Sequence, residues 1–118
     1  MKVLFVCVGN TCRSQMAEAI AKDMGHHAFS AGTHPGKEIA SNAIKVISEI
    51  GMTIKDQFPK SIEDIEIDGF DKIISMGCGV NCPNLEISED WNLEDPYGHE
   101  IDFYRKTRDK ILNCLSDL

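Results

Sequence analysis

Residues 2–14 read KVLFVCVGNTCRS, and the change of pattern within this stretch decides the fold. Lys2 to Val8 is a continuous apolar run rich in β-branched and aromatic residues, which is typical of a strand covered on both faces in a parallel sheet. Beyond Thr11 the apolar residues recur at helical spacing, at Met16, Ala17, Ile20, Ala21 and Met24. The stretch therefore predicts a strand, a loop at its carboxyl end and a helix.

The rest of the chain continues this alternation. We expect strands at residues 28–31 and 72–76 and a less regular edge strand at 85–91, where acidic residues interrupt the apolar pattern. Helices are expected from about residue 39 to 51, at 61–67 with Ser61 as cap, and at 102–118. The alternation predicts a three-layer α/β fold, in which a small parallel sheet of about four strands has helices on both faces.

Composition excludes several classes of function. The 118 residues suit one domain, residues 1–118, and 19 acidic against 12 basic residues give a net charge of −7, which disfavours nucleic acid as a partner. The longest apolar run, Val3 to Val8, is far shorter than the roughly 18 residues of a membrane span and shorter than a secretory signal. We therefore expect a cytoplasmic protein with no membrane partner.

Five cysteines are an odd number for a paired disulfide scaffold, so reduced, reactive or metal-bound thiols are the better interpretations. They are Cys7, Cys12, Cys78, Cys82 and Cys114. The four histidines show no metal spacing, and Cys78 and Cys82 lack the two further ligands of a structural zinc site. We expect no metal site.

The loop after the first strand has the composition of an oxyanion site. In open parallel sheets, ligands bind beyond the carboxyl ends of the strands, where backbone N–H groups can surround an anion at a helix N-terminus. Neither a Walker ending nor GxGxxG is present, so nucleotide binding has no motif support. The predicted oxyanion-binding loop consists of Val8, Gly9, Asn10, Thr11, Cys12 and Arg13.

Cys7 and Arg13 define the chemistry of this loop. The guanidinium of Arg13 can hold two oxygens of a tetrahedral oxyanion, while the N–H dipoles favour the thiolate of Cys7, which becomes a nucleophile. Ser14 could donate a hydrogen bond to that sulfur, and it could also be the N-cap of the helix. Cys12 is interpreted as a packing residue or a backup thiol.

Five further segments carry a resemblance to a known family. They are QMAE at 15–18, SAG at 30–32, MGCG at 76–79, CP at 82–83 and DWNLEDP at 90–96. With residues 7–14 they resemble, over the whole chain, the low-molecular-weight tyrosine phosphatase superfamily, and within it the thiol-linked arsenate reductases. The phosphatases usually have proline after the serine that matches Ser14, whereas the Gln-Met-Ala-Glu that starts at Gln15 is typical of the reductases.

The resemblance implies the fold of that superfamily and a role for each site residue. Asp95 would be the general acid that protonates the leaving oxygen, and Pro96 would fix its loop. Cys7 would bind arsenate covalently, Cys78 would attack Cys7 and release arsenite, and Cys82 would attack Cys78 to form a disulfide. No cofactor is bound, because thioredoxin or a small thiol would supply the electrons. The implied enzyme is an oxidoreductase of arsenical resistance.

Other functions remain open. With Cys7, Arg13 and Asp95 the chain could instead hydrolyse phosphotyrosine proteins through a phosphocysteine, although Gly98 follows Tyr97 where the phosphatases often carry a second tyrosine. Cys78 and Cys82 could be loop thiols without a redox role, or a small thiol could act directly on the Cys7 adduct. A non-enzymatic oxyanion or partner-binding module is a third hypothesis, which an intact nucleophile and acid disfavour.

Overall fold

Strand β1 (Lys2–Cys7) lies in the middle of the sheet in the computed structural model, which describes residues 1–77 and 86–118. The strand order is β2-β1-β3-β4, all parallel, with β2 at His27–Gly32, β3 at Lys72–Ser75 and β4 at Glu89–Asp90. Val3 to Val6 are completely buried, because β1 is paired along both edges and covered on both faces. The apolar run at the start of the chain therefore forms a strand covered on both faces, as predicted, and this strand is central in the sheet.

The two faces of the sheet are covered differently. The three α-helices pack together on one face, against Val3 and Phe5. They are α1 (Arg13–Asp23), α2 (Ser41–Glu49) and α3 (Ile101–Ser116). Leu4 and Val6 point to the opposite face, since successive side chains of a strand alternate. There they pack against the segment that carries the 3₁₀ turn η1 (Ile62–Asp64).

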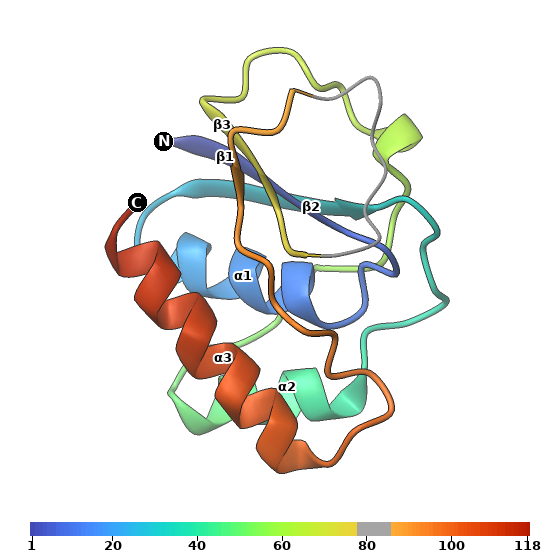
Figure 1. The fold of residues 1–118 in the computed structure, drawn as a ribbon, viewed down its shortest axis with the longest axis vertical. Coiled ribbons are helices and arrows are strands. Elements are labelled where there is room, and N and C mark those ends of the chain that lie inside the picture. The colour runs from blue at the N-terminus through green and yellow to red at the C-terminus, as the bar shows by residue number, and fades with distance from the viewer. Residues whose placement is uncertain (78–85) are drawn as a thin grey trace.

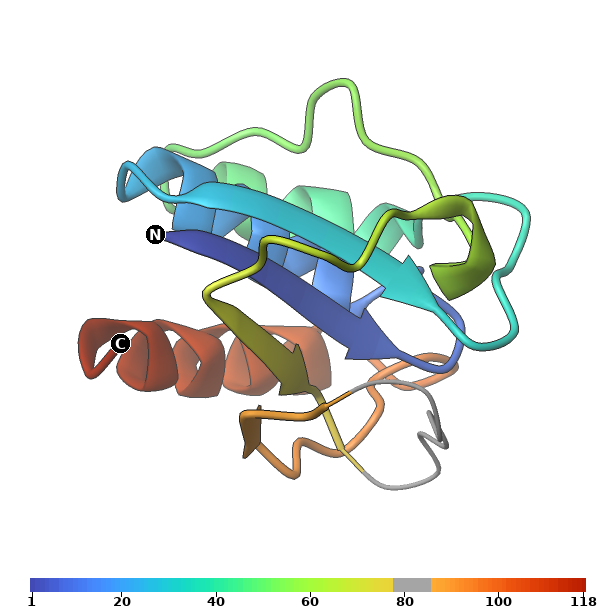
Figure 2. The same cartoon turned by 90° about the horizontal axis from the view of Figure 1, so that it is seen from above.

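Figures 1 and 2 show this arrangement, in which the sheet lies between the α-helices and the yellow-green segment with η1. The predicted α/β fold with a four-stranded parallel sheet is confirmed, whereas the α-helices expected on both faces lie on one face only. Its layers are unequal, because one face carries three α-helices and the other a single 3₁₀ turn among the described residues.

Two predicted elements are shorter than expected. The helix at 61–67 is only η1, although Ser61 does cap it by accepting a hydrogen bond from the Glu63 N–H at 3.2 Å. The edge strand at 85–91 is reduced to Glu89–Asp90, and residue 85 lies outside the described residues. Alternating acidic residues leave this segment little apolar surface to bury, so its pairing with β3 ends after two residues.

The topology brings the carboxyl ends of the strands together beside the start of α1. Cys7 pairs with Gly32, and Ser75 pairs with Asp90, so the loops that follow β1, β3 and β4 leave the same edge of the sheet. A Cβ atom at Gly32 would lie 2.6 Å from the Val8 carbonyl oxygen, and the glycine therefore permits the close approach of β2 to the first loop. In the described ranges, no helix is long and apolar enough to cross a membrane.

Candidate active site

The sulfur of Cys7 is buried and surrounded by hydrogen-bond donors. The backbone N–H of Asn10 lies 3.0 Å from this sulfur, and the hydroxyl of Ser14 lies 2.8 Å from it. Ser14 Oγ already accepts a hydrogen bond from Asn10 Nδ2 at 2.7 Å, so its own hydrogen is available to the sulfur. Two hydrogen-bond donors therefore reach the sulfur of the predicted nucleophile.

Asn10 shapes the loop, a role that the sequence analysis did not assign to it. It is completely buried and has a φ of 53°, in the left-handed region that asparagine tolerates better than most residues. Its Oδ1 accepts a hydrogen bond from the Lys60 N–H at 2.9 Å. Because the chain bends at this residue, the Asn10 N–H is directed back toward Cys7.

Ser14 does not cap the helix, so that prediction is wrong. Helix α1 starts at Arg13, Cys12 occupies the N-cap position, and the cap has no side-chain hydrogen bond. Ser14 is the second residue of the helix and points to the sulfur of Cys7. The helix starts two residues earlier than it would with Ser14 as the cap, and the Ser14 hydroxyl is engaged with Asn10 and Cys7 instead of a backbone N–H.

Arg13 is held by the ends of two distant segments. Its Nη1 donates to the Leu93 carbonyl oxygen at 2.7 Å and to that of Met76 at 3.4 Å. Gly77 makes room for it, since a Cβ atom there would lie 2.8 Å from Nη1 and the φ of this residue is +151°. The guanidinium, which is 3% exposed, is thus fixed beside the loop before any anion binds.

Asp95 lies on the far side of this guanidinium. Its Oδ2 is 3.8 Å from Arg13 Nη2, its Oδ1 accepts from the Tyr97 N–H at 3.1 Å, and its side chain is half-exposed. Pro96 is buried and follows it directly, which fixes the loop. Asp95 and Tyr97 line a cavity of about 460 Å³ together with Gly9 and Thr11 of the oxyanion loop. A carboxyl group here can deliver a proton to an oxygen of a bound anion.

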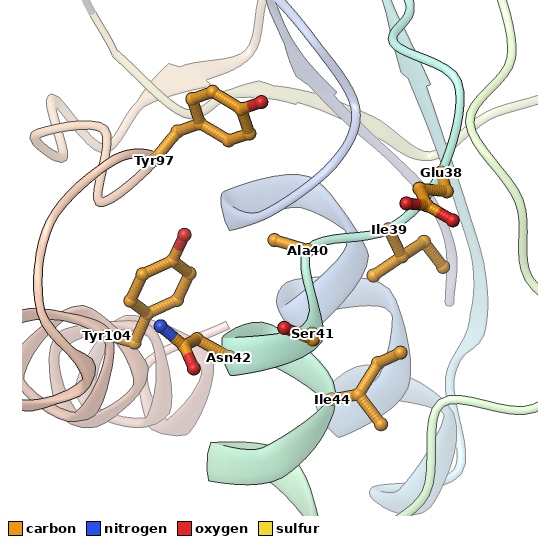
Figure 3. Close-up of a pocket in the computed structure, with 8 residues that line it drawn as sticks. All are labelled: Glu38, Ile39, Ala40, Ser41, Asn42, Ile44, Tyr97 and Tyr104. Atoms are coloured by element: carbon orange, nitrogen blue, oxygen red, sulfur yellow. The ribbon is translucent and has the colours of Figure 1, made fainter.

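A second cavity of about 450 Å³ adjoins the first, because Tyr97 and Glu38 line both. Figure 3 shows the rings of Tyr97 and Tyr104 on one side of it and Ala40 and Ser41, where α2 starts, on the other. The oxyanion loop lines the first cavity, and the second cavity offers room for a larger group attached to the anion.

Cys12 has a different environment from Cys7. It is 2% exposed and belongs to the apolar core, with its Sγ 3.7 Å from the hydroxyl of Tyr104. Burial raises the pKa of the Cys12 thiol, so it stays protonated at neutral pH. The structure therefore agrees with the packing role expected for Cys12.

The structure brings together four of the six predicted catalytic residues, Cys7, Arg13, Ser14 and Asp95. Cys78 and Cys82 lie outside the described residues. Gly77, which precedes Cys78 in the sequence, contacts Arg13. Within residues 1–77 and 86–118, no three histidine, cysteine or acidic side chains are grouped closely enough to hold a metal ion.

Comparisons with known proteins place this geometry in context. The model of the family described as low molecular weight phosphotyrosine protein phosphatase matches residues 2–118. A relative from Synechocystis sp., named glutaredoxin arsenate reductase, is 40% identical over 99% of this chain and 95% of its own length. A solved arsenate reductase in the phosphate binding state superimposes with a TM-score of 0.90 at 39% identity, over 98% of this chain and 94% of the other. A solved arsenate reductase in the oxidized state superimposes with a TM-score of 0.88 at 36% identity, over 99% of this chain and 95% of the other.

Proposed function

Since the chain belongs to the low molecular weight phosphotyrosine protein phosphatase family, we propose that it performs thiol chemistry on a bound oxyanion and that its reaction is the reduction of arsenate to arsenite. The observation that carries this choice is its similarity, over nearly the full length of both chains, to arsenate reductases of known sequence and structure. The site supports it, since a buried nucleophile and a fixed guanidinium lie at the two ends of one loop.

The first step uses residues of the described site. The Cys7 thiolate, stabilised by the Asn10 N–H and the Ser14 hydroxyl, attacks arsenic. Arg13 and the N–H groups of the loop hold the oxygens and balance their negative charge. Asp95 gives a proton to the departing hydroxyl group, which leaves as water, and a sulfur–arsenic(V) bond links Cys7 to the substrate.

The reduction itself needs a second thiol, which we assign to Cys78. Its thiolate attacks the sulfur of Cys7, the sulfur–arsenic bond breaks, and the bonding pair stays on arsenic, which leaves as arsenite. The resulting Cys7–Cys78 disulfide is attacked by Cys82, so Cys7 is released as a thiolate and the oxidised equivalent remains as a Cys78–Cys82 disulfide. Two thiols are thereby oxidised for each arsenic(V) reduced.

An external thiol must reduce this disulfide before the next turnover. We propose a thioredoxin-type protein or a small thiol as this reductant, and the printed name of the Synechocystis relative associates that protein with glutaredoxin. The cycle operates only where thiols are kept reduced, which is why we assign the protein to the cytoplasm.

Hydrolysis of phosphotyrosine is the second candidate function. Cys7, Arg13 and Asp95 would serve it equally well, with water in place of Cys78 releasing the phosphate from Cys7. The specific observation in its favour is the cavity lined by Tyr97 and Tyr104, which offers room for an aromatic leaving group beside the oxyanion loop.

A single-turnover thiol count distinguishes the two functions. The protein is reduced, freed of reductant and mixed with arsenate, and free thiols and arsenite are then measured together. We expect two thiols to be lost for each arsenite released, with the disulfide found between Cys78 and Cys82 by peptide mapping. Cys7→Ser should abolish both signals.

The matched control is Cys114→Ser, which removes a half-buried thiol of α3 that has no part in the proposed relay. This variant should still lose two thiols per arsenite. An unchanged thiol count without arsenite, in protein that still cleaves an aryl phosphate, would contradict the reductase and establish the phosphatase.

A further inference from the structure

The oxyanion loop is anchored from outside through the carbonyl groups of residues 7–11. Four of the five carbonyl oxygens accept hydrogen bonds from backbone N–H groups of the segment 33–40. Thr33 donates to Cys7 at 3.1 Å, His34 to Val8 at 2.8 Å, Gly36 to Gly9 at 2.9 Å and Ala40 to Thr11 at 3.0 Å. The first loop is therefore tied to the segment that follows β2.

This anchoring determines where the N–H groups of the loop point. In a trans peptide the C=O and the N–H point in opposite directions, and the described residues contain no cis peptide bond. A carbonyl held outward thus turns the next N–H inward. The peptide between Gly9 and Asn10 illustrates this, because its oxygen meets the Gly36 N–H while its N–H meets the sulfur of Cys7 at 3.0 Å.

The fifth carbonyl, that of Asn10, is held by a side chain. Nε2 of Gln15 donates to it at 3.0 Å, and the same nitrogen donates to the Phe58 carbonyl oxygen at 3.1 Å. Oε1 of Gln15 accepts a hydrogen bond from Gln57 Nε2 at 2.8 Å, and Gln57 Nε2 also donates to the backbone oxygen of Gln15 at 3.1 Å. Gln15 is completely buried, and these contacts use both of its donor hydrogens and its acceptor.

We infer that Gln15 is a positioning residue for the chemistry at Cys7, because it fixes the peptide between Asn10 and Thr11 and so completes the inward ring of N–H groups. Gln15 holds the Asn10 carbonyl outward, so the N–H of the same peptide, that of Thr11, points inward toward the anion. Its action on the nucleophile runs through Asn10, whose left-handed conformation aims its N–H at the sulfur. The inference rests on the proposed assignment of this loop as the oxyanion site.

Loss of the Gln15 donor should weaken both the contact of the Thr11 N–H with the anion and the contact of the Asn10 N–H with Cys7. A buried carbonyl without its partner is costly, so the Asn10–Thr11 peptide rotates toward another donor or toward water. The Thr11 N–H then leaves the anion, and the bend at Asn10 relaxes. We expect roughly tenfold weaker anion binding, the effect of losing about one hydrogen bond to a charged group. The Cys7 thiolate should also be less stabilised.

The test uses the reduced full-length chain and inorganic phosphate as the probe. Gln15→Met keeps the length of the side chain but removes the donor, and Gln57→Leu removes the support while Gln15 can still reach Asn10. The phosphate Kd is measured by calorimetry, and the rate of Cys7 alkylation by iodoacetamide is measured by mass spectrometry between pH 6 and pH 10. Ile47→Val, a core change in α2, controls for a general loss of stability.

For Gln15→Met we expect a roughly tenfold higher phosphate Kd and several-fold slower alkylation at pH 7. The difference in alkylation rate between the two proteins should shrink as the pH rises, because high pH favours the thiolate of any cysteine. Gln57→Leu should change both quantities in the same direction by less, and Ile47→Val should lower only the melting temperature.

A Gln15→Met variant with a lower melting temperature but unchanged phosphate binding and alkylation would make the residue merely structural and would overturn the inference. If that variant does not fold, Gln57→Leu decides, because wild-type values for both quantities would overturn it as well. Failure of the wild-type chain to bind phosphate would overturn the oxyanion site itself, and the inference with it.

Discussion

Cys7 and Cys12 lie five positions apart in one loop, yet their surroundings give them opposite properties. The sulfur of Cys7 has the Asn10 N–H and the Ser14 hydroxyl directed at it. The thiol of Cys12 lies in the core against Tyr104, where burial favours the neutral form. The difference explains how one loop holds a nucleophile and a packing thiol side by side.

The buried thiol of Cys12 makes the fold sensitive to alkaline pH. Its pKa in the folded chain is raised above the ordinary value of 9.0, so above pH 9 the unfolded chain loses this proton first and the free energy of unfolding falls as pH rises. Below pH 9 the contribution is fully present. Cys12→Ala should flatten the decline between pH 9 and pH 11, by at most about 1.4 kcal/mol per pH unit.

Urea unfolding of both proteins between pH 7 and pH 11, with reductant present, measures this slope. Cys12→Ala is expected to be less stable than the wild type at pH 7, because it leaves a small cavity in the core. If the free energy of unfolding fell equally steeply with pH in both proteins above pH 9, the alkaline loss of stability would not come from Cys12.

Helices α2 and α3 are joined at one end by a charged cluster. Glu49, the last residue of α2, accepts hydrogen bonds from Arg105 and Arg108 of α3. Arg108 also donates to the Val46 carbonyl oxygen at 3.0 Å, so a cation lies at the C-terminus of α2, where the helix dipole favours it. The opposite end of α2 and the segment before it line the second cavity of the site.

Neutralising Glu49 should loosen this contact. The hydrogen bond from Arg105 is the main cause that lowers the pKa of Glu49 below its ordinary 4.5, so the stabilisation is present above about pH 4.5 and is lost as pH falls through the pKa of the folded chain. Glu49→Gln should therefore lower the melting temperature at pH 7 and have a smaller effect at pH 3.

Differential scanning calorimetry at the two pH values tests this expectation. Glu66→Gln is the matched control, because Glu66 is an exposed acidic residue on the segment covering the other face of the sheet. High salt should shrink the Glu49→Gln effect at pH 7. An equal effect of Glu49→Gln at pH 3 and pH 7 would contradict an electrostatic origin.

Across the whole molecule, β1 is the common element of both cores. Its odd-numbered residues Val3 and Phe5 face the three α-helices, and its even-numbered residues Leu4 and Val6 face the η1 segment. It is also paired on both edges, with β2 and with β3. Opening β1 therefore requires the loss of both cores, whereas β4 is a two-residue edge strand.

Native-state hydrogen exchange should reflect this topology. We expect the amides of Val3 to Val6 to exchange most slowly, at rates set by global unfolding, and those of Glu89 and Asp90 to exchange through local opening. Exchange measured residue by residue with rising denaturant distinguishes the two regimes. Protection of β4 equal to that of β1 would contradict the central role of β1.

Local patterns in the sequence were sufficient to predict the strand at the start of the chain, the helix after it and the loop between them. Periodicity and the small residues of a turn depend only on neighbours in the chain. Residues 2–8 could therefore be predicted as a strand, and residues 16–24 as a helix, without knowing the rest of the fold. The same holds for the nucleophile and the arginine, since Cys7 and Arg13 lie within one strand–loop–helix unit.

The tertiary structure alone decided what depends on distant segments. Arg13 is held by the carbonyl groups of Met76 and Leu93, which lie 63 and 80 positions away in the sequence. Gln15 acquired its role by meeting Gln57, 42 positions away. Such contacts have no local signal, because they depend on how the chain packs in three dimensions. Thus the sequence by itself determined the type of chemistry, and the packing of the sheet edge determined which groups orient it.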